Sequence, residues 1–105
     1  LIRAGCDINK AMSDGRTPAY LAAQEDQTAA LALLIKAGCD VNQASKNGAT
    51  PVFVAAQTGH TAVLELLVEA GCDVNQADEN GGTPAHIAAQ NGHTAALKLL
   101  VKVGC

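Results

Sequence analysis

The stretch that decides the fold is residues 39–71, CDVNQASKNGATPVFVAAQTGHTAVLELLVEAG. It opens with a Cys-Asp-Val-Asn link, passes through an Asn-Gly turn signal, and then holds two short apolar segments separated by a Gly-His step. The pattern recurs on both sides, because the chain places a cysteine every 33 residues, at Cys6, Cys39, Cys72 and Cys105. A fixed period of this length is typical of a repeat protein, in which each unit buries its apolar side against its neighbours.

The sequence pattern within each unit predicts two short helices. In the central unit the first helix is expected to begin at Thr50-Pro51, because a threonine hydroxyl can accept a free backbone N–H and proline suits the first helical position. The second helix is expected to begin at Thr61, since Leu64 and Leu67 then fall on one face. The glycine before the next cysteine is expected to end it.

We therefore expect one all-α domain over residues 1–105, a solenoid of stacked helix-turn-helix units with projecting β-turn tips. Its three units are 6–38, 39–71 and 72–104, and residues 1–5 are the end of a truncated repeat. Neither end carries the polar capping repeat that stacked units need for solubility. We expect that the chain is a segment of a longer array or that it has further flanking residues.

Composition narrows the functional classes. The formal net charge is −3, and the seven Lys and Arg residues form no basic stripe, so nucleic acid is not an expected partner. No apolar run approaches the roughly 18 residues of a membrane span, so no membrane partner is expected either. Aromatic residues amount to 2%, so Ala, Leu, Val and Ile must fill the core. Such a core suits closely packed helices.

The repeated polar residues do not predict catalysis. Matching cysteines in stacked helices lie about 10 Å apart, whereas a disulfide needs Cα atoms within about 7 Å and zinc needs ligands that converge. We expect reduced, mostly buried thiols, which favours an intracellular, cytoplasmic location. His60, His93 and the Asp-Asn pairs of the links recur in every or nearly every unit, which favours structural roles. The sequence thus predicts no enzymatic activity, no cofactor and no metal site.

On these residues the chain resembles the ankyrin repeat family. The 33-residue period, Thr-Pro, Ala-Ala, Gly-His and the closing Gly-Cys-Asp-Val-Asn match the family's pattern along the whole chain. The resemblance implies an ankyrin-repeat solenoid that serves as a protein–protein interaction module. It also implies that the link asparagines Asn9, Asn42 and Asn75 are of a kind that an asparaginyl hydroxylase can modify.

Candidate binding residues emerge when the units are compared with one another. Positions shared by all units hold the stack, whereas positions that differ are free to face a partner. They cluster at the turn tips and along the first helices, where ankyrin proteins commonly bind their targets. The candidate partner-binding residues are Ser13, Asp14, Arg16, Tyr20, Glu25, Lys46, Asn47, Phe53, Thr58, Glu79, Asn80, His86 and Asn91.

Two aromatic residues depart from the family's Thr-Pro-Leu-His motif. Tyr20 and Phe53 stand where the family has histidine, and His86 alone retains it. The family's histidine ties the turn to the helix, so we expect less rigid turns in the first two units or a substitute contact made by the rings. Aromatic residues are also enriched among binding hot spots. Packing is the favoured interpretation for Phe53, and both interpretations stay open for Tyr20.

The sequence therefore predicts a non-catalytic module that binds another protein through its turn tips and concave inner-helix face. We expect the chain to be a monomer. The other arrangement that the uncapped terminal repeats allow is end-to-end stacking of copies. Two alternatives remain. The chain could be an engineered or consensus-derived scaffold without a natural target, as the likeness of units 39–71 and 72–104 would allow. It could also be a spacer segment of a larger multidomain protein.

Overall fold

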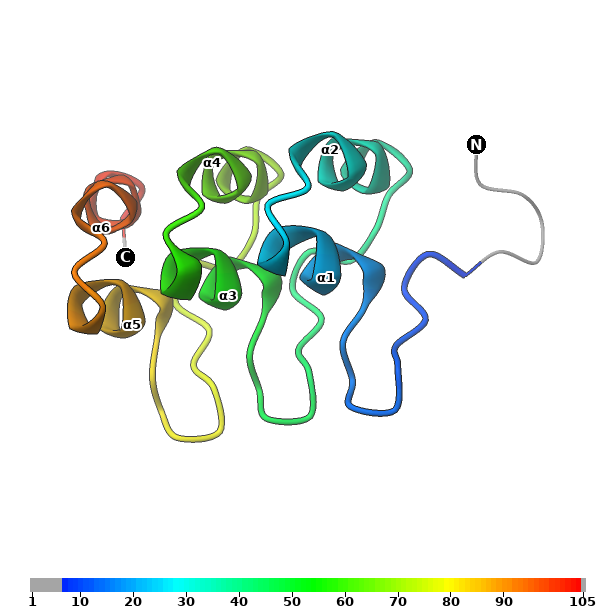
Figure 1. The fold of residues 1–105 in the computed structure, drawn as a ribbon, viewed down its shortest axis with the longest axis horizontal. Coiled ribbons are helices and arrows are strands. Elements are labelled where there is room, and N and C mark those ends of the chain that lie inside the picture. The colour runs from blue at the N-terminus through cyan, green and yellow to red at the C-terminus, as the bar shows by residue number, and fades with distance from the viewer. Residues whose placement is uncertain (1–6, 105) are drawn as a thin grey trace.

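The computed structural model describes residues 7–104, and within them it contains helices but no strand. The predicted truncated repeat at residues 1–5, together with Cys6 and Cys105, lies outside the described residues. The helices are α1 (Pro18–Gln24), α2 (Thr28–Lys36), α3 (Pro51–Thr58), α4 (Thr61–Glu69), α5 (Pro84–Gln90) and α6 (Thr94–Lys102). They form three antiparallel pairs in a row, and a hairpin-like loop projects from the same side of each pair (Figure 1). The predicted all-α solenoid is confirmed.

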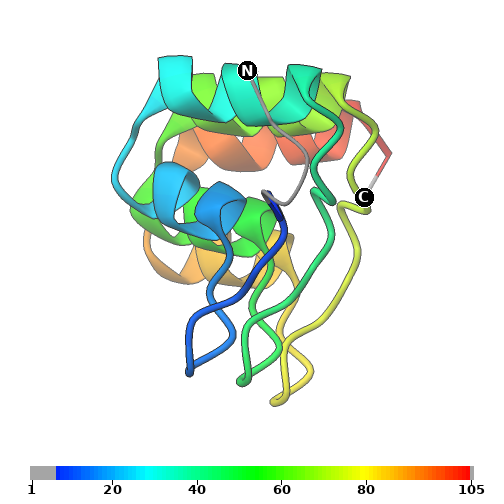
Figure 2. The same ribbon diagram turned by 90° about the vertical axis from the view of Figure 1, so that its right-hand side faces the viewer.

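The helices lie in two layers. The inner layer, next to the projecting loops, contains α1, α3 and α5, and the outer layer contains α2, α4 and α6 (Figure 2). Within the inner layer α1 packs against α3 and α3 against α5, and the outer helices follow the same order. The longest dimension of the molecule, 41 Å, runs along this row. Every helix pair therefore covers an apolar side of the pair beside it.

Threonine and proline begin the inner helices as predicted. Thr50 is the N-cap of α3, and its hydroxyl accepts the Phe53 backbone N–H at 3.2 Å. Thr17 caps α1 in the same way. Both threonine side chains are buried, so each hydroxyl satisfies a backbone donor that water does not reach. The cap thus fixes where the loop ends and the helix begins, which positions the residues that follow.

The end of α1 shows how the first unit differs from the others. Gly59 is the C-cap residue that follows α3, and it has a φ of +78°. In the first pair Asp26 takes the equivalent place, and its φ of +57° makes it the one described non-glycine residue in the left-handed region. Aspartate tolerates this conformation better than most residues with a Cβ. The backbone path is therefore kept where the Gly-His step is missing.

The core lies between the two layers and between successive pairs. Leu31, Leu64, Leu67 and Leu100 are fully buried on the inward face of the outer helices. Opposite them the inner helices present small side chains, such as the fully buried Ala55. Small residues let inner helices approach closely, whereas leucines fill the wider space between the layers. The predicted core residues Leu64 and Leu67 are thus confirmed.

The links between pairs are joined by a ladder of side chain to backbone hydrogen bonds. Asp73 donates its backbone N–H to Asn42 Oδ1 at 2.7 Å, and Asp40 donates to Asn9 Oδ1 at 2.8 Å. Within each link the aspartate accepts in turn, since the Asn42 N–H lies 2.9 Å from Asp40 Oδ1. The structural role predicted for these pairs is confirmed. The side chains of Asn9 and Asn42 thus bond each link to the next.

Histidine and cysteine also serve the framework. His60 Nδ1 lies 3.2 Å from the carbonyl oxygen of Ala23 in the preceding pair. Cys39 and Cys72 are free thiols that are partly buried, less enclosed than the sequence suggested. Burial raises the pKa of both thiols, that of Cys72 to about 11. Both therefore stay protonated near neutral pH, where a thiolate would be needed for nucleophilic chemistry.

Candidate functional site

Three hairpin tips carry most of the candidate residues, and we call them the first (residues 12–16), second (45–49) and third (78–82) tip. Each is a tight turn closed by backbone hydrogen bonds. In the second tip the Gly48 N–H donates to the Ser45 carbonyl at 2.9 Å, and the Ser45 N–H donates to the Ala49 carbonyl at 2.8 Å. The turn signals in the sequence thus predicted these loops correctly.

The tips are bonded to one another. Lys46 in the second tip donates its backbone N–H to the Asp14 carbonyl at 3.0 Å. Glu79 in the third tip donates in the same way to the Asn47 carbonyl at 3.0 Å. The three tips therefore form one continuous edge, and these bonds fix the positions of the tips relative to one another.

The first tip is braced by an ion pair. Arg16 Nε lies 2.7 Å from Asp14 Oδ2, and Arg16 Nη1 donates to Gln24 Oε1 on α1 at 3.2 Å. The Arg16 backbone N–H also donates to Asp14 Oδ1, and it is the main cause that lowers the pKa of this exposed carboxyl. An exposed pair of this kind adds little to stability. Its effect is to hold the guanidinium between the tip and the helix.

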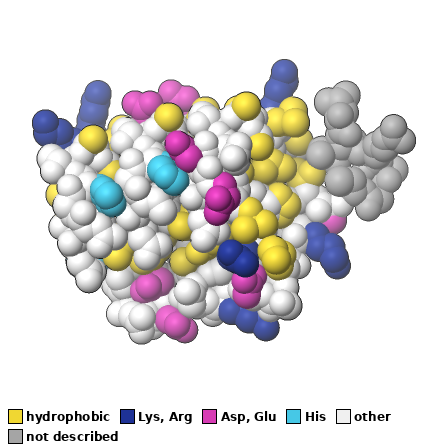
Figure 3. All heavy atoms as spheres, viewed as in Figure 1, with side chains coloured by type: hydrophobic (Ala, Val, Ile, Leu, Met, Phe, Trp, Pro, Cys, Tyr) yellow, Lys and Arg dark blue, Asp and Glu magenta, His cyan; other side chains and the backbone are white. Residues whose placement is uncertain are grey.

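The second and third tips differ from the first in charge. Lys46 and Glu79 are exposed, and within residues 7–104 the Arg16–Asp14 contact is the one salt bridge. Figure 3 shows acidic side chains at the lower left of the molecule and side chains of both signs to their right. Asp78, beside Glu79, has one carboxylate oxygen occupied by the N–H groups of Asn80 and Gly82. The edge thus changes from a basic to an acidic character between neighbouring tips.

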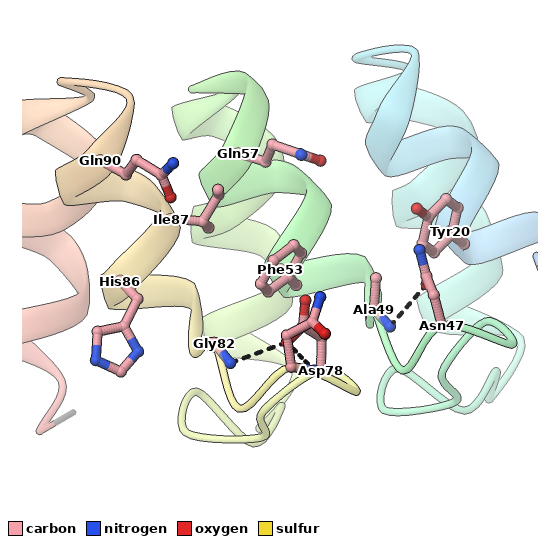
Figure 4. A pocket seen from close by; sticks show the side chains of 11 residues that line it. Tyr20, Asn47, Ala49, Phe53, Gln57, Asp78, Gly82, His86, Ile87 and Gln90 are labelled. Carbon is pink, nitrogen blue, oxygen red and sulfur yellow. Dashed lines mark hydrogen bonds between the residues drawn. The ribbon is translucent and has the colours of Figure 1, made fainter.

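A groove with a volume of about 340 Å³ runs between the second and third tips and the inner helices α1, α3 and α5. We call it the central groove (Figure 4). Its lining residues are Tyr20, Asn47, Ala49, Phe53, Gln57, Asp78, Asn80, Gly82, His86, Ile87 and Gln90. A smaller hollow of about 200 Å³ between the first and second tips shares Tyr20 and Asn47 with it. The two form one hollowed strip along the tips.

The two aromatic rings form part of the packing beneath this strip. Tyr20 is 8% exposed and Phe53 is 7% exposed, whereas His86 is exposed. His86 Nδ1 accepts the Thr83 backbone N–H at 3.0 Å, a bond that a phenyl or phenol ring cannot replace at that position. Burial also raises the pKa of the Tyr20 hydroxyl. The rings therefore contribute apolar contact in place of the histidine's hydrogen bond.

Other candidates lie apart from the groove. Glu25, Thr58 and Asn91 stand at the far ends of the inner helices, away from the tips. The Thr58 hydroxyl donates to the Val54 carbonyl within α3 at 2.8 Å. Ser13 is exposed on the first tip. The structure thus gathers Tyr20, Asn47, Phe53, Asn80 and His86 around the central groove. Asp14, Arg16 and Lys46 line the smaller hollow, and the other five candidates, Ser13, Glu25, Thr58, Glu79 and Asn91, line neither.

The unit comparison missed three polar residues of the groove. Gln57 and Gln90 are exposed, and each lies one helical turn beyond Phe53 and His86 (Figure 4). Because glutamine occurs at this position in every unit, a search for differing positions passed over it. Its spacing of four residues from a candidate on the same helix was the available signal. Asp78 was missed although it stands in a varied tip.

Stacked helix pairs with a linked row of tips define a helical repeat protein. Among residues 7–104 no helix has the length and apolar character needed to cross a membrane. The same residues contain no group of three or more His, Cys, Asp or Glu side chains placed to hold a metal ion.

Comparison with known protein families identifies the family of the chain. Residues 1–78 match the family described as ankyrin repeats (3 copies), and residues 80–105 match a single ankyrin repeat. The chain belongs to the ankyrin repeat family. No curated protein matches it in a sequence comparison. Ankyrin repeats are generally non-catalytic protein–protein interaction modules.

Proposed function

We propose that the chain binds a partner protein through the central groove, the second and third tips, and the exposed edges of α3 and α5. The observation that carries this proposal is the convergence of candidate residues from separate units on one groove. Residues shared by the units are mostly used in the caps, the core and the link ladder. The surface that remains is shaped, polar and held in place, as a preorganised interface requires.

The charges of this surface differ between the second and third tips. Lys46 and Glu79 lie on neighbouring tips with opposite signs, and the acidic Asp78 adds to the third. Complementary charges select a partner's orientation and speed association more than they add affinity. We propose that the partner places an acidic group near the second tip and a basic group near the third. Gln57 and Gln90 then offer amide hydrogen bonds across the groove between them.

The proposal also covers the domain organisation, the oligomeric state, enzymatic activity and the location of the chain. We propose that units 6–38, 39–71 and 72–104 act as one domain over residues 1–105 and that the chain is a monomer without enzymatic activity. The binding face would then be fully available to the partner. We place it inside the cell, in the cytoplasm, because free thiols such as Cys39 and Cys72 persist in a reducing compartment.

Two charge-swap variants test the binding face. Lys46→Glu with Glu79→Lys reverses both tip charges, whereas Glu65→Lys with Lys98→Glu reverses two exposed charges on the outer helices. Both variants keep the net charge. Cross-linking capture with the wild-type chain supplies a partner, and titration of the purified partner gives its Kd. We expect the tip variant to weaken binding about tenfold or more and the outer variant to leave Kd unchanged.

The proposal fails if no partner is captured that binds the purified chain, an outcome that favours a scaffold or spacer. It also fails if both swaps weaken binding equally, or if the outer swap alone does so. Circular dichroism of both variants confirms that each keeps its helices, because all four side chains are exposed.

A further inference from the structure

The chain contains three Asn-Gly pairs, at Asn47, Asn80 and Asn91. In such a pair the glycine nitrogen can attack the asparagine side-chain carbonyl, since glycine has no Cβ to hinder it. The reaction needs the carboxamide to turn and the local backbone to open. The three pairs stand in different surroundings.

Asn47 is held firmly. Its Oδ1 accepts the Ala49 N–H at 3.2 Å and also the Ser45 hydroxyl. Its carbonyl accepts the Glu79 N–H from the third tip, while the second tip is bonded to the first through Lys46. The second tip is therefore tied on both sides, and both its side chain and its backbone resist the rearrangement.

In Asn91 the side-chain nitrogen that would leave in this reaction is hydrogen-bonded. Its Nδ2 donates to the Gln57 carbonyl of the preceding inner helix at 3.1 Å. Asn91 is also the C-cap residue of α5, so its backbone N–H is bonded to that helix. The amide nitrogen that would have to depart is thus engaged across the boundary between two helix pairs.

Asn80 is the least restrained of the three. It is exposed, and its carboxamide makes no hydrogen bond to any residue from 7 to 104. The Gly81 N–H donates to the Asp78 carbonyl at 3.0 Å, but the Gly48 and Gly92 N–H groups are bonded in the same way, so this bond does not distinguish the three pairs. Within residues 7–104 the third tip is bonded to the second tip alone, and nothing lies within 4 Å of a Cβ built on Gly81. A Cβ on Gly48, by contrast, would meet the Glu79 nitrogen at 2.7 Å. Asn80 therefore differs from the other two asparagines in its unbonded carboxamide, and from Asn47 also in the open space beside its tip.

We propose that Asn80 is a site of spontaneous modification by water. The Gly81 nitrogen forms a bond to Asn80 Cγ, the Cγ–Nδ2 bond breaks, and ammonia leaves with the proton from the glycine nitrogen. Water then opens the five-membered imide at either carbonyl and yields aspartate or isoaspartate. No oxidant or enzyme is needed.

The product changes the proposed binding surface. A carboxylate replaces a neutral amide on a tip that already carries Asp78 and Glu79, so the acidic character of the third tip grows. The isoaspartate form also adds one backbone carbon to the tip. The chemistry itself does not depend on any partner, so it can be tested separately from the proposed function.

Peptide mass mapping of the aged 105-residue protein tests the assignment. The folded chain is incubated in warm, mildly alkaline buffer made with heavy-oxygen water, which labels only carboxylates formed by hydrolysis. We expect Asn80 to react about fivefold faster than Asn47, the effect of one additional backbone hydrogen bond on local opening. In urea the two rates should converge, because the restraints on Asn47 are lost.

Two variants sharpen the test. Asn80→Gln should remove the labelled product at the third tip, and Ser45→Ala should raise the rate at Asn47 by freeing its Oδ1. The proposal is overturned if Asn47 or Asn91 reacts as fast as Asn80 in the folded chain, or if Asn80 shows no labelled product.

Discussion

Replacing Leu67 by alanine is expected to lower the free energy of unfolding by about 2–5 kcal/mol. Leu67 lies in α4, the outer helix of the central pair, and its side chain is fully buried at 0% exposure. Its removal leaves a cavity in the central pair, where α4 packs between α2 and α6, and the helices on both sides cannot collapse into it. Urea unfolding followed by circular dichroism measures the change as a shift in midpoint.

Leu33→Ala is the matched control. Leu33 lies in α2, on an equivalent outer helix, but it is 58% exposed. We expect its truncation to change stability by no more than about 0.5 kcal/mol. Equal midpoints for the two variants would mean that the faces of the outer helices have been assigned wrongly.

The second large effect is expected at Gly48. Its φ is +84°, a conformation that costs an alanine about 1–2 kcal/mol. An added Cβ would also lie 2.7 Å from the Glu79 nitrogen and 3.0 Å from the Asp78 carbonyl carbon, both of them backbone atoms that cannot rotate away. Gly48→Ala should therefore cost about 1–3 kcal/mol more, as the tips are forced apart.

Gly81→Ala separates the two contributions. Gly81 has nearly the same φ, +80°, but nothing described lies within 4 Å of its added Cβ. Its substitution should cost only the conformational part, about 1–2 kcal/mol. If urea midpoints show the two variants to be equally stable, the second and third tips do not pack against each other in solution.

Much of the fold could be predicted because its determinants are local and repeated. Thr50 and Pro51 alone predict where a helix begins. The structure confirms the reason, because the buried Thr50 hydroxyl accepts a backbone N–H of α3. The Asp-Asn pairs of the links recur at every boundary, so a role between neighbouring units followed from their repetition. Asp26 was less predictable, since its left-handed backbone is imposed by the framework and not by its own preference.

The candidate site was harder to predict, because it depends on how the units lie side by side. Unit comparison found Asn47, Asn80 and His86, which differ from their neighbours or stand in varied tips. It passed over Gln57 and Gln90, whose identity between units conceals that they face solvent beside the groove. A residue can be shared by all units and still be available to a partner.

The burial of the two rings was likewise a question of tertiary packing. Tyr20 and Phe53 occupy a position that histidine fills in the third pair, and only the structure shows that they fold under the tips while His86 stays exposed. They contribute to the groove as its apolar lining. Exposed anchors for a partner must therefore be sought among the charged and amide side chains around them.

The measurement that most directly tests the proposed binding face is hydrogen exchange of the chain with and without the partner obtained by capture. We expect slower exchange in the second and third tips and in α3 and α5, with α4 and α6 unchanged, because the partner covers the inner layer. Protection confined to α4 and α6, with the tips exchanging as in the free chain, would contradict the account.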